Sequence, residues 1–303
     1  MHTLPPDHAE RMARARLALD GVSLGDGFGE RFFGPVDIVA RRLADRQLPP
    51  APWGTTDDTE MAVAVTAILE RCGAVDRDLL AAEFARRYAR DPRRGYGGTA
   101  HHILRALASG ADWRVVSPAV FSGSGSMGNG AAMRIAPLGA YFADDLERVA
   151  LEARAASEPT HAHPDGQAGA VAVAVAAALA WRMRTCPDGQ ALLAGVVAHT
   201  PDGDTRGGLQ RALRLRAQNT SLTTAAEVLG TGHNVISADT VPFALLCASL
   251  HLDSFAEAMW TTVAGLGDRD TTCAIAGGVV AMALGCDKLP ADWLAAREPL
   301  RLD

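Results

Sequence analysis

Three long apolar runs place the strongest constraint on how this 303-residue chain folds. Residues 61–69, 167–181 and 274–284 are apolar on nearly every side of a helical projection, and Ala and Val supply much of that surface. A helix without a polar face has to be covered by protein on all sides. In the third run, Gly277 and Gly278 lower helix propensity but let a neighbouring backbone approach. The sequence therefore predicts central, buried helices enclosed by further helices.

The remaining pattern is also helical. Residues 76–90 place Leu80, Phe84 and Tyr88 on one helix face, and residues 144–156 repeat that pattern. Alternation of apolar and polar residues, which is typical of strands, is scarce. No internal repeat or linker-like segment divides the chain, so we predict one all-α domain over residues 1–303. Loops rich in Gly and Pro are expected at residues 47–54, 91–98, 117–130, 158–166 and 229–239.

Composition excludes several classes of protein. The formal net charge is −6 and the basic residues are scattered, which argues against nucleic-acid binding. The five cysteines are widely spaced and form no Cys-x-x-Cys, so neither a zinc cluster nor a disulfide framework is expected. Residues 1–20 lack the apolar stretch of a secretory signal, and the longest apolar run is shorter than the ~20 residues of a membrane span. We expect a cytoplasmic monomer that binds neither membrane nor nucleic acid.

Two predicted helices begin with unusual clusters of Asp and Thr. Residues 55–60 read Thr-Thr-Asp-Asp-Thr-Glu, and residues 268–272 read Asp-Arg-Asp-Thr-Thr. A capping box of Thr55 and Asp58 explains part of the first cluster. Adjacent aspartates exceed what capping needs and repel one another, whereas two divalent cations would neutralise four of them. Oxygen ligands of this kind suit Mg²⁺ or Mn²⁺. On spacing alone, capping and metal binding both remain open.

A glycine-rich loop occupies residues 121–134. It contains a formal Gly-x-Gly-x-x-Gly at residues 123–128, but a dinucleotide fold needs a preceding strand, and Pro118 interrupts the run before the loop. That leaves an oxidoreductase as a weak alternative. Consecutive glycines leave backbone N–H groups free to face an anion such as pyrophosphate. The other interpretation is a flexible surface loop.

Five segments in order resemble the ADP-ribosylglycohydrolase family, which includes the dinitrogenase reductase-activating glycohydrolases and the ADP-ribosyl-acceptor hydrolases. They are residues 21–29, 56–59, 125–134, 160–161 and 267–271. The resemblance implies a compact all-α domain with two Mg²⁺ ions, or Mn²⁺, in a cleft. It also implies the metal ligands, which are Thr56, Asp57, Asp58, Asp268, Asp270 and Thr271.

The resemblance further implies a site for ADP-ribose. Phe121 matches a position that stacks on adenine, and His161 matches a histidine near the ligand, although either residue alone would suit a purely structural role. The loop that wraps the diphosphate and ribose corresponds to Gly125, Ser126, Met127, Gly128 and Asn129. Residues 95–98 and 230–233 resemble further loops of the cleft.

Two positions depart from the family pattern. Several members have a glutamate where this chain has Phe33, and the nearest acid here is Glu30. Arg269 stands where the family's Asp-Thr-Asp-Thr has its first Thr. Because it lies between two implied ligands, Arg269 either braces a ligand from behind or faces substrate.

The implied reaction is hydrolysis of the glycosidic bond between ADP-ribose and an acceptor. Asp57 or Asp58 is expected to accept the proton of the attacking water, and Asp26 to act as a structural cap. The expected acceptor is protein arginine, as for the activating glycohydrolases. The alternatives are a serine or O-acyl linkage, or an ADP-ribose-binding relative without turnover.

Overall fold

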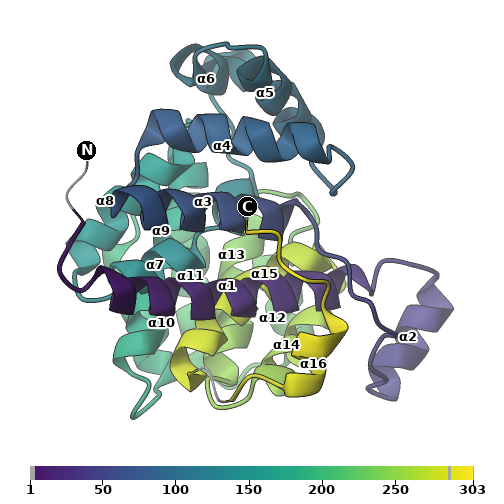
Figure 1. The fold of residues 1–303 in the computed structure, drawn as a ribbon. Helices are drawn as coiled ribbons and strands as arrows, with labels where there is room; N and C mark the ends of the chain where they lie inside the picture. The colour runs from purple at the N-terminus through teal and green to yellow at the C-terminus, as the bar shows by residue number, and fades with distance from the viewer. Residues whose placement is uncertain (1–3, 286–287, 303) are drawn as a thin grey trace.

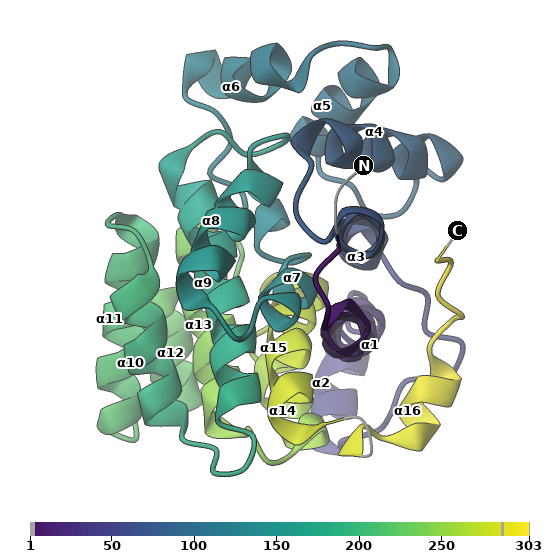
Figure 2. The same ribbon diagram turned by 60° about the vertical axis from the view of Figure 1, so that its left-hand side comes forward.

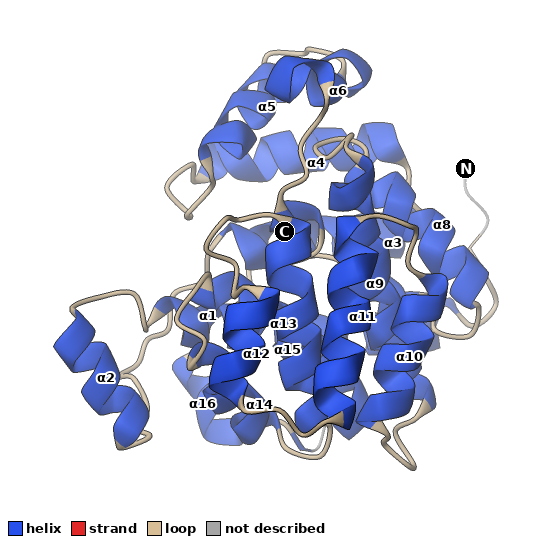
Figure 3. Ribbon diagram, turned by 180° about the vertical axis from the view of Figure 1, so that it is seen from behind, coloured by secondary structure: helices blue, strands red, loops and turns tan. Residues whose placement is uncertain are grey.

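The computed structural model describes residues 4–285 and 288–302, and within these ranges it contains helices and no strands (Figures 1 and 3). This confirms the predicted all-α fold. The helices are α1 (His8–Glu30), α2 (Val36–Ala44), α3 (Asp57–Cys72), α4 (Arg77–Arg90), α5 (Gly98–Ala108), α6 (Trp113–Gly123), the 3₁₀ helix η1 (Asn129–Ala131), α7 (Ala136–Tyr141), α8 (Leu146–Ser157), α9 (Pro164–Arg182), α10 (Gly189–His199), α11 (Asp204–Ala217), α12 (Leu222–Leu229), α13 (Ser237–Leu250), α14 (Phe255–Val263), α15 (Arg269–Leu284) and α16 (Ala291–Ala296).

The three apolar runs form α3, α9 and α15, and all three helices are largely buried, as predicted. Each helix extends beyond its apolar run at the N-terminal end, because the polar residues that precede the run form the first helical turn. Helix α9 contacts α7, α8, α10, α11, α13 and α15, so it is enclosed on all sides.

Several predicted loops are shorter than expected. Residues 117–123 belong to α6, which bends where Phe121 and Ser122 adopt positive φ angles. Helix α9 begins at Pro164, since proline suits the first helical position, and α13 begins at Ser237. Helical structure therefore reaches further into the Gly- and Pro-rich segments than their composition predicts.

Helices α1 and α15 lie in direct backbone contact (Figure 2). Gly21, Gly25 and Gly29 are spaced four apart and so share one face of α1. A Cβ at Gly25 would lie 2.0 Å from the Cys273 carbonyl oxygen, and one at Gly277 would lie 2.3 Å from the Gly21 carbonyl oxygen. The close approach predicted for the Gly277–Gly278 pair is thus confirmed, with α1 as the neighbour.

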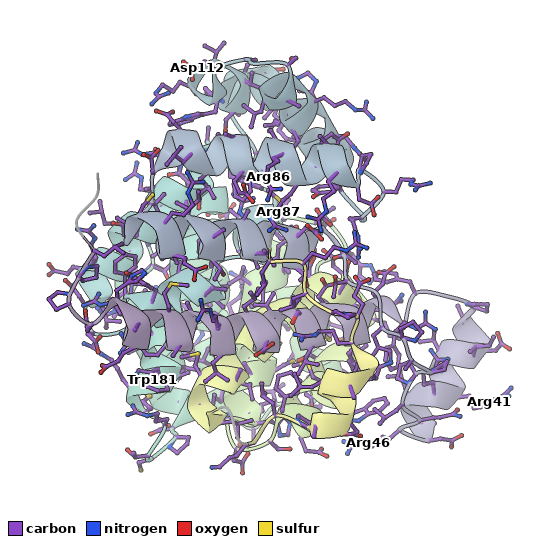
Figure 4. The ribbon with its side chains drawn as sticks, viewed as in Figure 1. Arg41, Arg46, Arg86, Arg87, Asp112 and Trp181 are labelled. Carbon is purple, nitrogen blue, oxygen red and sulfur yellow. The ribbon has the colours of Figure 1, made fainter. Side chains whose placement is uncertain are left out.

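Helices α4, α5 and α6 form a separate layer over α3, whereas α2 projects from the side of the molecule (Figures 1 and 3). The fully buried Arg87 guanidinium lies between α4 and α3 (Figure 4). It donates to Glu83 of α4 at 2.9 Å and to Glu60 of α3 at 3.0 Å. This ion pair ties the upper layer to the start of α3.

Among the described residues, no helix is both long enough and apolar enough to cross a membrane.

We predict that Gly25→Ala destabilises the protein. In an ordinary helix the change would add about 1 kcal/mol of helix propensity. Here the new methyl group meets fixed backbone of α15, so we expect a net loss of about 1–3 kcal/mol in the free energy of unfolding, measured by urea denaturation. Gly34→Ala is the matched control because nothing lies within 4 Å of its added Cβ. A Gly25→Ala protein as stable as the wild type would contradict the close packing.

Candidate functional site

A cavity of about 540 Å³ opens where the starts of α3, α5 and α15 meet the glycine-rich loop. Its wall includes every predicted site residue except Thr56, which lines a neighbouring hollow. The lining members of the predicted set are Asp57, Asp58, Phe121, Gly125, Ser126, Met127, Gly128, Asn129, His161, Asp268, Asp270 and Thr271. Residues from four distant parts of the sequence therefore share one cavity.

The start of α3 is capped from another helix. The buried carboxylate of Asp26 in α1 accepts hydrogen bonds from the backbone N–H and hydroxyl of Thr56, both at 2.9 Å, and from the same two groups of Thr59. Burial raises the Asp26 pKa to about 6. Asp26 thus has the structural role expected for it.

The predicted capping box of Thr55 and Asp58 is wrong by one residue. Thr56 is the N-cap, and its hydroxyl oxygen accepts a hydrogen bond from the Asp58 N–H at 3.3 Å. Thr55 instead donates its hydroxyl to Glu298, near the C-terminal end of the chain, at 2.7 Å. A cap from α1 and a contact from the C-terminal segment are tertiary effects that a local capping pattern does not contain.

The start of α15 is held by residues from other parts of the chain. Asp268 is the N-cap residue, but its side chain makes no capping hydrogen bond. The Asn129 amide donates to Asp268 Oδ2 at 2.6 Å, and the Asp268 N–H donates to the Thr231 carbonyl oxygen at 3.0 Å. Asn129 therefore orients one of the four clustered aspartates from within the glycine-rich loop.

The clustered aspartates are crowded with like charge. Burial raises the Asp57 pKa to about 8, helped by repulsion from Asp26 and Asp268. Burial also raises the pKa of Asp58, with repulsion from Asp270 next in size, and it raises the pKa of Asp270, with repulsion from Asp268 next. Carboxylates held this close favour either protons or a cation.

Two of these carboxylates have an oxygen with no partner. Asp58 Oδ1 and Asp270 Oδ1 are buried and accept no hydrogen bond. Buried polar atoms are almost always paired, so unpaired carboxylate oxygens at a cavity are typical of a site for a cation. In residues 4–285 and 288–302, no three His, Cys, Asp or Glu side chains are already arranged as a finished metal site. The residues fit a cation by charge and by unpaired oxygens, without forming a closed shell.

The glycine-rich loop packs tightly against the segment before α9. A Cβ at Gly125, whose φ is +74°, would lie 2.7 Å from both Ala162 Cβ and the His163 nitrogen. In the described part of the chain, the backbone N–H groups of Ser126 and Met127 have no hydrogen-bond acceptor. The loop is thus a packed wall with free donors, as the anion-binding interpretation predicts, and it is not a flexible surface loop.

The two predicted ligand-contacting rings occupy different environments. The Phe121 side chain is 60% exposed at the cavity, which rules out the core interpretation. His161 is buried, and burial together with the nearby Arg134 cation lowers its pKa to about 3. His161 is therefore neutral at physiological pH.

Part of the cavity wall comes from residues outside the sequence motifs. Ile103 contributes from α5, and residues 234–236 contribute from the loop before α13. Gly95, Gly97 and Gly98 line the cavity as well, as expected for the cleft loop predicted at residues 95–98. The predicted cleft loop at residues 230–233 does not line the cavity itself and lies just before the lining residues 234–236. Gly232 packs against Asp268, and a Cβ added there would lie 2.5 Å from Asp268 Cβ.

The two departures from the family pattern contact each other. The Arg269 guanidinium lies 4.8 Å from the centre of the Phe33 ring and donates to the carbonyl oxygens of Phe32 and Leu266 at 3.2 and 2.9 Å. Arg269 does not face the cavity, and its side-chain contacts among the described residues reach none of the implied ligands, so neither predicted alternative describes it; it braces the end of α1 instead. Glu30 lines the neighbouring hollow, and its pKa is raised by burial and by repulsion from Asp26 and Asp268.

Known proteins resemble this chain over almost its whole length. The profile of the ADP-ribosylglycohydrolase family matches residues 7–302. ADP-ribosylhydrolase ARH3 of Homo sapiens is 28% identical over 326 residues, which cover 94% of this chain and 89% of that protein. The Danio rerio ARH3 is also 28% identical, over 95% of this chain and 87% of that protein. A solved structure described as an ADP-ribosylglycohydrolase-related protein complex superposes with a TM-score of 0.60 at 23% identity, covering 96% of this chain and 94% of that chain, so it shares the fold.

We predict that the metal-free protein loses stability as pH rises from about 5 to about 8. An unfolded Asp titrates near pH 4, whereas Asp57 in the folded protein titrates near pH 8. Between these values the folded state keeps a proton that the unfolded state has released, so rising pH favours unfolding. We expect the unfolding temperature, measured by circular dichroism in EDTA, to fall as the pH rises over this range.

In the variant Asp57→Asn, the unfolding temperature should fall less steeply with pH than in the wild type. At about pH 8 the variant should unfold at a higher temperature than the wild type. Asp45→Asn is the control, because Asp45 is exposed, and it should keep the wild-type slope. An unfolding temperature that rises over this pH range, or an unchanged slope in Asp57→Asn, would contradict the crowded-carboxylate account.

Proposed function

The chain belongs to the ADP-ribosylglycohydrolase family, and from that premise we propose that it is a metal-dependent hydrolase of the glycosidic bond between ADP-ribose and an acceptor. One observation carries the proposal. The two acidic helix starts line the same cavity as the glycine-rich loop and leave Asp58 Oδ1 and Asp270 Oδ1 buried without a partner. A cation-binding edge next to an anion-binding wall suits a sugar joined to a diphosphate.

The proposed cofactor is a pair of Mg²⁺ ions, or Mn²⁺, since the donors are all carboxylate or hydroxyl oxygens. The proposed ligands are Thr56, Asp57, Asp58, Asp268, Asp270 and Thr271. Thr56 has the weakest support, because its hydroxyl lies against Asp26 and outside the main cavity. When bound, such ions would act as Lewis acids that polarise an attacking water.

The chain's own carboxylates have two roles in the reaction. Cleavage at the anomeric carbon passes through a transition state with positive charge on the sugar, which the surrounding aspartates stabilise. Asp57 or Asp58 takes the proton of the attacking water, because both line the cavity at the start of α3. Asn129 holds Asp268 in place through its 2.6 Å hydrogen bond.

The proposed site for the rest of ADP-ribose is the glycine-rich loop, which adjoins the aspartates through Asn129. The free N–H groups of Ser126 and Met127 suit the diphosphate oxygens. The exposed Phe121 ring offers a face for adenine. His161 lines the same wall as a neutral ring.

The proposed acceptor is arginine, joined to ADP-ribose through nitrogen. This assignment rests on the resemblance of the motifs to those of the activating glycohydrolases. Arg269 braces the end of α1 outside the cavity, so it does not repel a cationic leaving group there. The neighbouring hollow adjoins the cavity at Gly95 and carries side chains of both signs, so its charge favours neither linkage. An O-linked acceptor is the second candidate. Phe33, in place of a family glutamate, favours the third, a binding protein without turnover.

The direct test is release of ADP-ribose from arginine-linked and serine-linked substrates, with Mg²⁺ and with EDTA. We expect faster release from the arginine linkage and loss of activity in EDTA. Asp270→Asn should lose Mg²⁺-dependent release while keeping its helical circular dichroism, because it removes an anionic ligand and keeps the shape. Asp45→Asn should behave as wild type.

Faster serine release would overturn the arginine assignment alone. Activity that persists in EDTA, or near wild-type release by Asp270→Asn, would overturn the metal site. Tight binding of ADP-ribose without release of it from either substrate would support the binding protein.

Phe121→Ala should weaken ADP-ribose binding by about 1–3 kcal/mol if the ring stacks on adenine. Saturating turnover should change little, since the metal-binding residues stay in place. Isothermal titration with ADP-ribose measures the loss. Val115→Ala is the control, because Val115 lies on the same helix, is 67% exposed and does not line the cavity. Equal affinities for the two variants would show that Phe121 does not stack.

A further inference from the structure

A fully buried arginine lines the cavity without an acidic partner. Arg134 follows η1, and in the described part of the chain no carboxylate lies within ion-pair distance of it. Its guanidinium stacks 4.3 Å from the centre of the Phe84 ring, and its Nε has no acceptor. An unpaired buried charge is costly to keep. The proposed metal site and phosphate-binding loop do not account for it.

The polar contacts of Arg134 lead to Thr160. Arg134 Nη2 donates to the Thr160 hydroxyl oxygen at 2.8 Å and to the Ala156 carbonyl oxygen at 3.1 Å, while Nη1 lies 3.6 Å from Met61 Sδ. A guanidinium only donates hydrogen bonds. The Thr160 oxygen is therefore the acceptor, and the hydroxyl hydrogen points elsewhere.

The Thr160 hydroxyl hydrogen has one acceptor within reach among the described residues, which is His161 Nδ1 at 2.8 Å. If Nδ1 carried the proton, the buried Thr160 hydroxyl would be left without an acceptor, at the cost of an unmade hydrogen bond. Hydrogen-bond donation therefore runs from Arg134 to the Thr160 oxygen and from the Thr160 hydroxyl to His161 Nδ1, so Nδ1 is an acceptor and carries no proton.

The opposite ring nitrogen faces the glycine-rich loop. A Cβ added at Gly128 or at Gly130 would lie 3.3 Å from His161 Nε2. The backbone of His161 is fixed as well, because its N–H donates to the Ser157 carbonyl oxygen at 2.8 Å and its carbonyl accepts from Gln167 at 3.0 Å. The ring therefore has a set orientation against the loop.

We propose that Arg134 and Thr160 are positioning residues that hold His161 as the neutral tautomer with the proton on Nε2. His161 then offers the ligand a hydrogen-bond donor and has no role as a base. Together, His161 and the free N–H groups of Ser126 and Met127 give this side of the cavity several hydrogen-bond donors. Such a wall selects groups that only accept hydrogen bonds, as the diphosphate oxygens of ADP-ribose do. The identity of the ligand rests on the proposed function, whereas the tautomer does not.

The first experiment measures the tautomer in the ligand-free protein. The protein is labelled with ¹⁵N-histidine, and the His161 signals are assigned by their loss in His161→Gln. We expect the pattern of a neutral ring protonated at Nε2, unchanged between about pH 5 and about pH 8. A proton on Nδ1, or titration of His161 in this range, would overturn the proposal whatever the protein binds.

The second experiment links the tautomer to binding. Thr160→Val removes the hydroxyl at nearly constant volume, and Thr160→Ser restores it. Losing one oriented neutral hydrogen bond corresponds to a fold-change of roughly 3 to 10, so we expect Thr160→Val to weaken ADP-ribose binding by that factor. We also expect a mixture of His161 tautomers in that variant. Thr160→Ser should resemble the wild type in both measurements, and Mg²⁺ titration should be unchanged in each variant.

A Thr160→Val protein that binds ADP-ribose as tightly as Thr160→Ser would overturn the positioning role. If Thr160→Val fails to fold, the tautomer in the wild type and in Thr160→Ser still decides the question. If the wild type does not bind ADP-ribose, the proposed function fails, and the ¹⁵N measurement tests the tautomer alone.

Discussion

The site depends on the backbone contact between α1 and α15. No side chain separates the two helices where Gly25 faces the Cys273 carbonyl oxygen and Gly29 faces that of Arg269. This contact sets where α15 begins, and therefore where Asp268 and Asp270 lie. The same helix α1 holds the start of α3, because Asp26, next to Gly25, accepts four hydrogen bonds from Thr56 and Thr59. One helix thus brings both acidic helix starts to one cavity. A displacement of α1 would move both sets of aspartates.

This arrangement costs stability. Five carboxylates, including that of Asp26, lie close enough to repel one another, and the pKa of Asp57 rises to about 8 as a result of burial and this repulsion. A structural cluster would be expected to satisfy its oxygens, yet Asp58 Oδ1 and Asp270 Oδ1 have no partner. Crowded, unsatisfied acids at the ends of two rigid helices are typical of a site whose charge is completed by a bound cation. The buried Arg134 does not complete that charge, since its hydrogen bonds go to Thr160 and Ala156.

The sequence predicts features that follow from local patterns. Helices α3, α9 and α15 were recognisable because they lack a polar face. The motifs identified the acidic helix starts, the glycine-rich loop and His161, all of which line the cavity, but not Ile103 or residues 234–236. The missed features depend on tertiary contacts. The helix that Asp26 caps is α3, about thirty residues away in sequence, and the partner of Thr55 is Glu298. The hydrogen bond of Arg134 reaches Thr160, which follows α7 and α8 in the sequence. The pairing of Arg269 with Phe33 joins two departures from the family pattern that looked independent, because residues far apart in sequence meet only in the folded chain.

The central claim is that two helix starts held by α1 form one cation site. Crystals grown with Mn²⁺ test it most directly, because anomalous scattering locates the ions without assumptions about the ligands. The account predicts anomalous peaks in the cavity, bound by oxygens of Asp57 or Asp58 from α3 and by Asp268 or Asp270 from α15. Peaks that contact residues of one helix start alone, peaks outside the cavity, or an empty cavity at saturating Mn²⁺ would contradict it.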